Sequence, residues 1–65
     1  MKEVWLEVDK NGSEFWYSLV PEREDGYWAS PIGEYSAFER LFPGAIKILT
    51  GKELTWNDEP IKIEL

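Results

Sequence analysis

The side chains in this sequence that could take part in chemistry are mostly carboxylates and indoles. The 65 residues include 13 Asp and Glu, 7 Lys and Arg and 4 Trp, but no His and no Cys. The chain therefore lacks a thiolate nucleophile, the commonest general base and the commonest ligands of zinc. Its serines have no histidine to activate them, and paired carboxylates need a cleft that a domain of this size has little volume to form. We expect a protein that is not an enzyme and that uses no metal ion and no cofactor.

The segment from Asp9 to Glu14 has the alternating oxygen ligands with which a calcium loop begins. In the EF-hand pattern, however, the glycine comes three residues after the second ligand, and a bidentate glutamate closes the loop. Here Gly12 directly follows Asn11, and the sequence on both sides is typical of strands. The segment is better explained as a hairpin turn, because Asn-Gly is the strongest short-range hairpin signal.

The residues around this turn predict a two-stranded hairpin. Residues 2–9 alternate between apolar and acidic side chains, as in a half-buried strand. A two-residue turn at Asn11-Gly12 fixes the register, which pairs Val8 with Phe15, Leu6 with Tyr17 and Val4 with Leu19. These six side chains would form one apolar face. The other face would carry the candidate partner-binding residues, an acidic and aromatic set made up of Glu3, Trp5, Glu7, Asp9, Glu14 and Trp16.

The carboxylates on that second face suggest a function. Side chains on one face of a strand repeat about every 6.7 Å, which is close to the spacing of phosphates along one strand of DNA. A row of carboxylates could therefore imitate nucleic acid and occupy the basic surface of a nucleic-acid-handling protein. Trp5 and Trp16 would be the anchors of such an interface. Two alternatives are that the carboxylates only keep an outer strand soluble and that the C-terminal half covers both indoles.

The composition also limits the partners. The formal net charge is −6 and the isoelectric point is near 4.4, so the chain has no basic stripe and we expect no direct contact with nucleic acid. No apolar run approaches the roughly 20 residues that a membrane span needs, and Met1 is not followed by the apolar core of a signal peptide. We expect a cytoplasmic protein without a membrane segment.

The rest of the chain predicts further strands and one helix. Ser36-Ala-Phe-Glu39 matches a capping box, so a helix of about two turns should begin there and end at Pro43-Gly44. The remaining segments predict short strands at residues 27–30, 46–50, 53–56 and 61–65. The expected fold is a single compact α+β domain over residues 1–65. It is a small antiparallel sheet of five or six short strands with one short helix packed on one face.

Residues 5–31 also resemble a WW domain, the three-stranded module that binds proline-rich peptides. The resemblance rests on two tryptophans with 22 residues between them, a hairpin turn, an aromatic triplet and a final Trp-x-x-Pro. It implies a structural cluster of Trp5, Trp16 and Pro31 and a ligand groove of Phe15, Tyr17 and Trp28. The sequence departs from the family pattern because no Leu-Pro precedes Trp5 and no histidine follows the triplet.

These observations predict a small acidic protein-binding module, for which there are three candidate functions. The favoured form is an inhibitor or nucleic-acid mimic that binds a protein partner with a basic surface. The alternatives are a WW-like binder of proline-rich peptides and a structural subunit of a larger assembly. Clustered carboxylates would favour mimicry, a concave Tyr/Trp groove would favour peptide binding, and an apolar patch would favour assembly.

Overall fold

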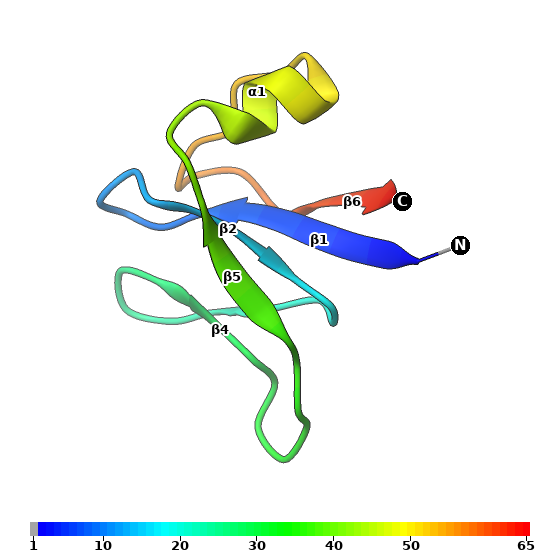
Figure 1. The fold of residues 1–65 in the computed structure, drawn as a ribbon. Coiled ribbons are helices and arrows are strands. Elements are labelled where there is room, and N and C mark those ends of the chain that lie inside the picture. Colours follow the sequence, from blue (N-terminus) through cyan, green and yellow to red (C-terminus); the bar gives the residue numbers. More distant parts are fainter. Residues whose placement is uncertain (1) are drawn as a thin grey trace.

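The computed structural model describes residues 2–65, which form two antiparallel sheets and one short helix (Figure 1). The four-stranded sheet has the strand order β5-β2-β1-β6, and the two-stranded sheet pairs β3 with β4. This arrangement confirms an antiparallel α+β fold. Within residues 2–65, no helix is long and apolar enough to cross a bilayer. The elements in chain order are β1 (Glu3–Val8), β2 (Glu14–Tyr17), β3 (Glu22–Arg23), β4 (Trp28–Ala29), β5 (Phe38–Leu41), α1 (Ala45–Thr50) and β6 (Ile61–Glu64).

The first hairpin forms, but its predicted register is wrong by one residue. Leu6 lies opposite Trp16 and not opposite Tyr17, and the same shift runs along both strands. A two-residue type I′ turn needs a positive φ at Asn11, whereas the described residues have positive φ only at glycines. The turn instead has three residues, because the Gly12 N–H donates to the Asp9 carbonyl at 2.8 Å and the Asp9 N–H donates to the Ser13 carbonyl at 2.9 Å. The Asn11 side chain accepts the Ser13 N–H at 2.9 Å and stabilises this longer turn.

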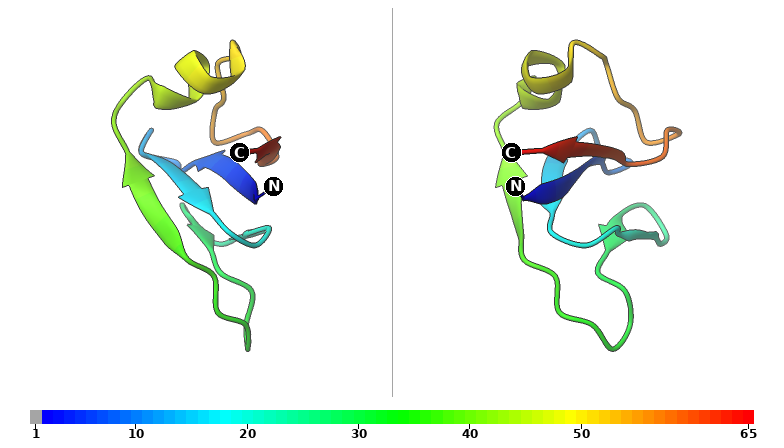
Figure 2. Two further views of the ribbon diagram at one scale, coloured as in Figure 1. Left: turned by 45° about the vertical axis from the view of Figure 1, so that its right-hand side comes forward. Right: turned by 90° about the vertical axis from the view of Figure 1, so that its right-hand side faces the viewer.

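The register decides which side chains share a face of the four-stranded sheet. On one side, called the groove face below, Trp16 lies beside Leu6 and packs on a buried cluster of Val4, Leu6, Val8 and Ile46, the last of these from α1. On the opposite face, Tyr17 lies beside Trp5, and Trp28 of β4 packs beneath β1. Figure 2 shows α1 and the β3–β4 hairpin on opposite sides of β1. The four-stranded sheet is therefore the middle layer.

The helix lies later in the chain than the capping box predicts. Residues 38–41 form β5, which pairs with β2, and the helix occupies residues 45–50, where a strand was expected. Ser36 is buried, and its Oγ accepts the Leu19 N–H at 3.1 Å instead of capping a helix. The free edge of β2 supplies a full ladder of partners for this segment, and such tertiary pairing outweighs a local capping signal.

The C-terminal half follows the predictions only in part. The expected strand at 53–56 is a loop with a turn, whereas the final strand is confirmed as β6 and the short strand at 27–30 contains β4. β6 pairs with β1, and the pairing extends to Lys2 and Leu65, whose backbones exchange hydrogen bonds of 3.0 and 2.7 Å. The two ends of the described chain are therefore neighbours, where β1 begins and β6 ends.

Candidate functional site

An apolar groove of about 540 Å³ lies on the groove face of the molecule. The four-stranded sheet forms its floor and α1 forms one wall. The lining is almost entirely aliphatic and indole, with charged residues only at the rim, and consists of Lys2, Glu3, Val4, Leu6, Trp16, Ser18, Ala37, Leu41, Leu49, Ile63 and Leu65. We call this hollow the apolar groove.

The groove exists because a short helix covers a longer sheet. α1 has only six residues, and of these Ala45 and Ile46 are buried. Leu49 keeps 52 % of its surface exposed at the wall of the groove, and Leu65 keeps 66 % exposed at the far end. Part of the sheet face that would form a closed core in a larger domain is therefore open to solvent.

The helix wall is fixed in place by a carboxylate from β2. The N-cap residue of α1 is Gly44, which has no side chain to satisfy the first backbone N–H groups. Glu14 takes this role, because its two carboxylate oxygens accept the N–H of Gly44 at 2.7 Å and the N–H of Ile46 at 2.8 Å. The negative charge also interacts favourably with the N-terminal end of the helix.

The opposite face of the sheet buries a carboxyl group without a donor. Glu7 is 1 % exposed, and neither of its oxygens accepts a hydrogen bond from any residue in the range 2–65. Burial raises its pKa to about 9, helped by a hydrogen bond to Asp9 and by the charge of Asp9. A carboxylate can only accept, so the hydrogen bond to Asp9 forms when Glu7 carries its proton. Glu7 is consequently neutral at pH 7 and has no charge to offer a partner.

The surroundings of Glu7 form a network that attaches β4 to the sheet. The Trp28 N–H donates to Asp9 Oδ1 at 3.0 Å, and the Trp28 indole N–H donates to the Val8 carbonyl at 3.1 Å. The Tyr17 hydroxyl donates to the Trp28 carbonyl at 2.9 Å. Burial raises the pKa of Tyr17 to about 12, with further contributions from the charges of Glu7 and Asp9. These contacts have a structural role, because they are closed off beneath the indole of Trp28.

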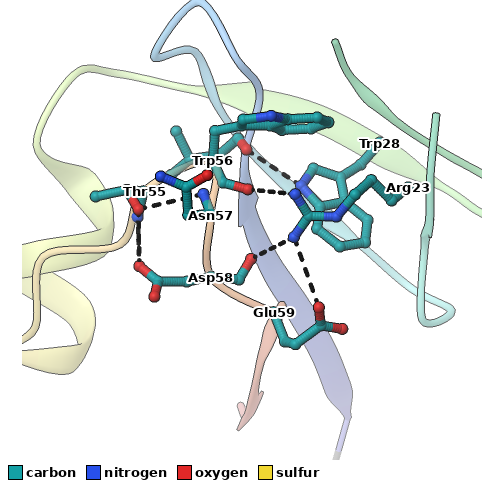
Figure 3. A network of polar contacts seen from close by, with 8 residues as sticks. Arg23, Trp28, Thr55, Trp56, Asn57, Asp58 and Glu59 are labelled. Atoms are coloured by element: carbon teal, nitrogen blue, oxygen red, sulfur yellow. Dashed lines mark hydrogen bonds and ion pairs between the residues drawn. The ribbon is translucent and has the colours of Figure 1, made fainter. Parts of the chain in front are cut away.

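Arg23 joins the small sheet to the C-terminal loop (Figure 3). Its guanidinium lies against two indoles that meet edge to face, 4.5 Å from the ring centre of Trp28 and 4.6 Å from that of Trp56. It donates to the carbonyl of Trp56 at 2.7 Å and to that of Asp58 at 3.3 Å, and it pairs with Glu59 at 3.5 Å. Both terminal nitrogens of the group are bonded to the loop, so this stack works as an internal clip.

The six residues predicted to bind a partner do not share a face. Glu3 is exposed and pairs with Lys62 at 3.5 Å, and Trp5 lies half-buried beneath the same lysine. Glu7 is buried, and Asp9 is half-buried beside it. The one-residue register shift moves the other two, Glu14 and Trp16, to the groove face. The predicted row of carboxylates is therefore broken.

The implied WW-like groove does not form either. Tyr17 and Trp28 are 5 % and 4 % exposed, so neither ring can receive a peptide. The third strand of a WW sheet would pair with the second, whereas β4 pairs with β3, and β5 takes the place beside β2. Trp16, expected in the structural cluster, lines the apolar groove.

The groove residues that the sequence interpretation missed come from the C-terminal half. Leu41, Leu49, Ile63 and Leu65 all line the groove. The alternation of the last strand places Ile63 and Leu65 on one face, and this pattern could have been used to predict their role. The local sequence does not show, however, that the same face also carries Trp16. Among residues 2–65, no three carboxylates come close enough to share a metal ion.

Comparisons of this chain with protein-family models, with curated proteins and with solved structures found no match.

Proposed function

We propose that the chain is a small non-enzymatic protein-binding module whose apolar groove receives apolar side chains of another protein chain. The observation that carries this proposal is the open groove of about 540 Å³ lined by residues such as Trp16, Leu41 and Ile63. Covering apolar surface stabilises a complex by about 25 cal/mol per Å² before the costs of association. Apolar surface that a small domain leaves open in this way is typical of an interaction site.

The groove is suited to binding because its walls are ordered before a partner arrives. Its floor consists of hydrogen-bonded strands, and Glu14 fixes the start of the helix that forms the wall. A preformed surface loses little conformational entropy on binding. The partner therefore mainly needs an apolar surface whose shape is complementary to the groove.

The acidity of the chain supports a second proposal, in which the partner has a basic surface and this protein acts as its inhibitor. A net charge of −6 speeds the approach of a basic protein and disfavours an acidic one. Imitation of phosphate spacing by the first hairpin has lost its geometric support, because Glu7 is buried and Glu14 faces α1. What remains is general electrostatic attraction, and binding of this kind weakens as salt is added.

The groove proposal can be tested with a defined probe. We would titrate the ¹⁵N-labelled protein with a synthetic amphipathic helical peptide built from Leu and Lys, and with a peptide of the same composition whose Leu residues are scattered. The expected result is saturable shifts of the Trp16 indole and of Leu41 and Ile63 with the first peptide only, since only it presents a continuous apolar face.

A pair of adjacent substitutions provides the matched control. Leu49 and Ile48 are neighbours on α1 and are 52 % and 75 % exposed, but only Leu49 lines the groove. Leu49→Glu should weaken peptide binding by about tenfold or more, and Ile48→Glu should leave it within about twofold. Equal loss in both variants, or no shift at Trp16 with either peptide, would refute the proposed site.

A further inference from the structure

The loop between β4 and β5 carries two large apolar side chains that nothing covers. Ile32 is 94 % exposed and Tyr35 is 88 % exposed, the highest values for large apolar side chains among residues 2–65. The loop extends away from the sheets in every view (Figures 1 and 2). Two large apolar side chains exposed close together on one projecting turn are a candidate contact surface.

This projecting turn is ordered by its own hydrogen bonds and by its attachment to the sheet. The Glu34 N–H donates to the Pro31 carbonyl at 3.2 Å, and Gly33 has the positive φ of 83° that a type II turn requires at its third residue. After the turn, the buried Ser36 hydroxyl lies 3.3 Å from Ser18 Oγ. Two rigidly presented side chains can bind without a large loss of conformational entropy.

We propose that this turn, residues 31–35, occupies the apolar groove of a second copy of the chain, so that two copies exchange their turns about a two-fold axis. The inference rests on the proposed function, because it names the occupant of the same groove. Each molecule carries both an exposed apolar turn and an open apolar groove, and the turn rejoins the sheet at Ala37, which itself lines the groove. A two-fold axis beside Ala37 would let both exchanges occur at once and close the assembly at two chains.

The charges beside the two surfaces are also complementary. Glu34 lies between the two apolar residues of the turn in sequence and is exposed, and Lys2 is an exposed residue at the rim of the groove. The other charged residue of the rim, Glu3, is already paired with Lys62 at 3.5 Å, so Lys2 is the rim charge that a carboxylate can approach. Docking of the turn would bring the Glu34 carboxylate of one copy toward the Lys2 ammonium of the other. Such a rim pair contributes little affinity but favours one orientation.

The size and charge of the two surfaces determine how tightly the two copies are expected to bind each other. A turn with one aromatic and one aliphatic anchor buries a few hundred Å², so two exchanged turns reach only the lower range of stable interfaces, and we expect a dissociation constant of the order of 100 µM. The two chains each carry a net charge of −6, and their repulsion opposes dimerisation. Added salt should therefore strengthen the dimer, which is the reverse of its effect on a basic partner.

The dimer can be tested by sedimentation equilibrium of the full chain from about 10 µM to 1 mM at low and high salt, a range that brackets the expected constant. A turn variant combines Ile32→Asp with Tyr35→Asp, and a groove variant carries Leu49→Glu. Each should weaken dimerisation by about tenfold or more. Their controls are Tyr27→Asp, at another exposed tyrosine, and Ile48→Glu, beside the groove. Amide spectra of all four variants would be recorded to check that each variant remains folded.

Mixing the two defective variants distinguishes turn exchange from other contacts. The turn variant keeps an intact groove and the groove variant keeps an intact turn, so the mixture can form one of the two contacts. We expect a heterodimer in the mixture that is weaker than the wild-type dimer but stronger than either variant alone, with filtered NOEs between the Tyr35 ring of one copy and the Trp16 indole of the other.

The outcomes separate this inference from the proposed function. A wild-type chain that stays monomeric up to about 1 mM, but still binds the amphipathic peptide, would overturn the dimer and leave the groove proposal standing. Dimerisation that the turn variant does not change would also overturn the inference. If the wild-type chain neither binds the peptide nor self-associates, the proposed function itself is refuted.

Discussion

The carboxylate of Glu14 accepts the backbone N–H of Ile46 at 2.8 Å and so joins the second strand to the helix that walls the groove. The two residues are 32 positions apart in sequence. A helix of six residues is not stable by itself, so its position depends on this contact and on the burial of Ile46.

Glu14→Ala should lower the free energy of unfolding by about 2 kcal/mol, because two backbone N–H groups lose a charged acceptor. Urea denaturation would measure the loss, and amide shifts in α1 would locate it. Glu39→Ala, on the exposed strand β5, is the matched control and should change stability by less than about 0.5 kcal/mol. Similar losses in both variants would contradict the anchoring role of Glu14.

Glu7 should make the protein less stable as the pH rises. Its pKa is near 4.5 when exposed and about 9 in the folded protein, so folding takes up a proton between these two values. The contribution of protonated Glu7 to stability is fully present below pH 4.5. Between pH 4.5 and about 9, the free energy of unfolding falls by up to about 1.4 kcal/mol per pH unit. Glu7→Gln removes the titrating group and should flatten the profile.

Denaturation midpoints at pH 5, 7 and 9 would measure this effect. Relative to wild type, Glu7→Gln should gain about 2 kcal/mol of stability between pH 5 and pH 7. Glu3→Gln, at an exposed carboxylate on the same strand, should follow the wild-type profile. A wild-type profile that stays flat across this range would show that Glu7 is ionised in the folded protein.

Arg23→Lys should destabilise the protein by about 1–2 kcal/mol although the charge is retained. Lysine has no planar head group to lie against both Trp28 and Trp56 and also reach both loop carbonyls. Hydrogen exchange at residues 55–59 should accelerate, since the loop loses its attachment. Glu59 is itself 86 % exposed, so Glu59→Gln removes only a solvated ion pair and should cost less than about 0.5 kcal/mol. Equal effects would mean that the ion pair, and not the stack, holds the loop.

Gly12→Ala should cost about 1 kcal/mol through backbone strain alone. Gly12 has a φ of 90°, and nothing lies within 4 Å of the position a Cβ would take. Lys10→Ala in the same turn should be close to neutral. Thermal unfolding of both variants would measure the difference, and a Gly12→Ala variant as stable as Lys10→Ala would contradict the positive φ of Gly12.

The turn also shows how far the sequence could predict the fold. The alternation of residues 2–9 and 61–65 identified β1 and β6, and Asn11-Gly12 identified the hairpin. The dipeptide is compatible with turns of two or three residues, however, and one extra residue moves every side chain of β2 to the other face. This shift separated Trp16 from Trp5, and the packing of Trp28 against β1, which buries Glu7, broke the rest of the candidate site.

The helix was misplaced for a different reason. Ser36 and Glu39 match a capping box, but their segment also fits the open edge of β2, and only the assembled sheet shows that this edge needs a partner. The sequence at residues 45–50 is rich in β-branched residues, whereas the glycines at positions 44 and 51 close a helical turn at both ends. Local propensity could not decide between these signals.

The hydrogen-bonded pairing of Lys2 with Leu65 has a practical consequence for tethered binding experiments. Both residues line the apolar groove, so a segment fused to either end of the chain emerges beside the groove's opening. A weak ligand joined through a short flexible linker would be held there at an effective concentration of the order of millimolar. The same placement puts an affinity tag at either end next to the groove, so immobilisation should use a side chain on the β3–β4 hairpin.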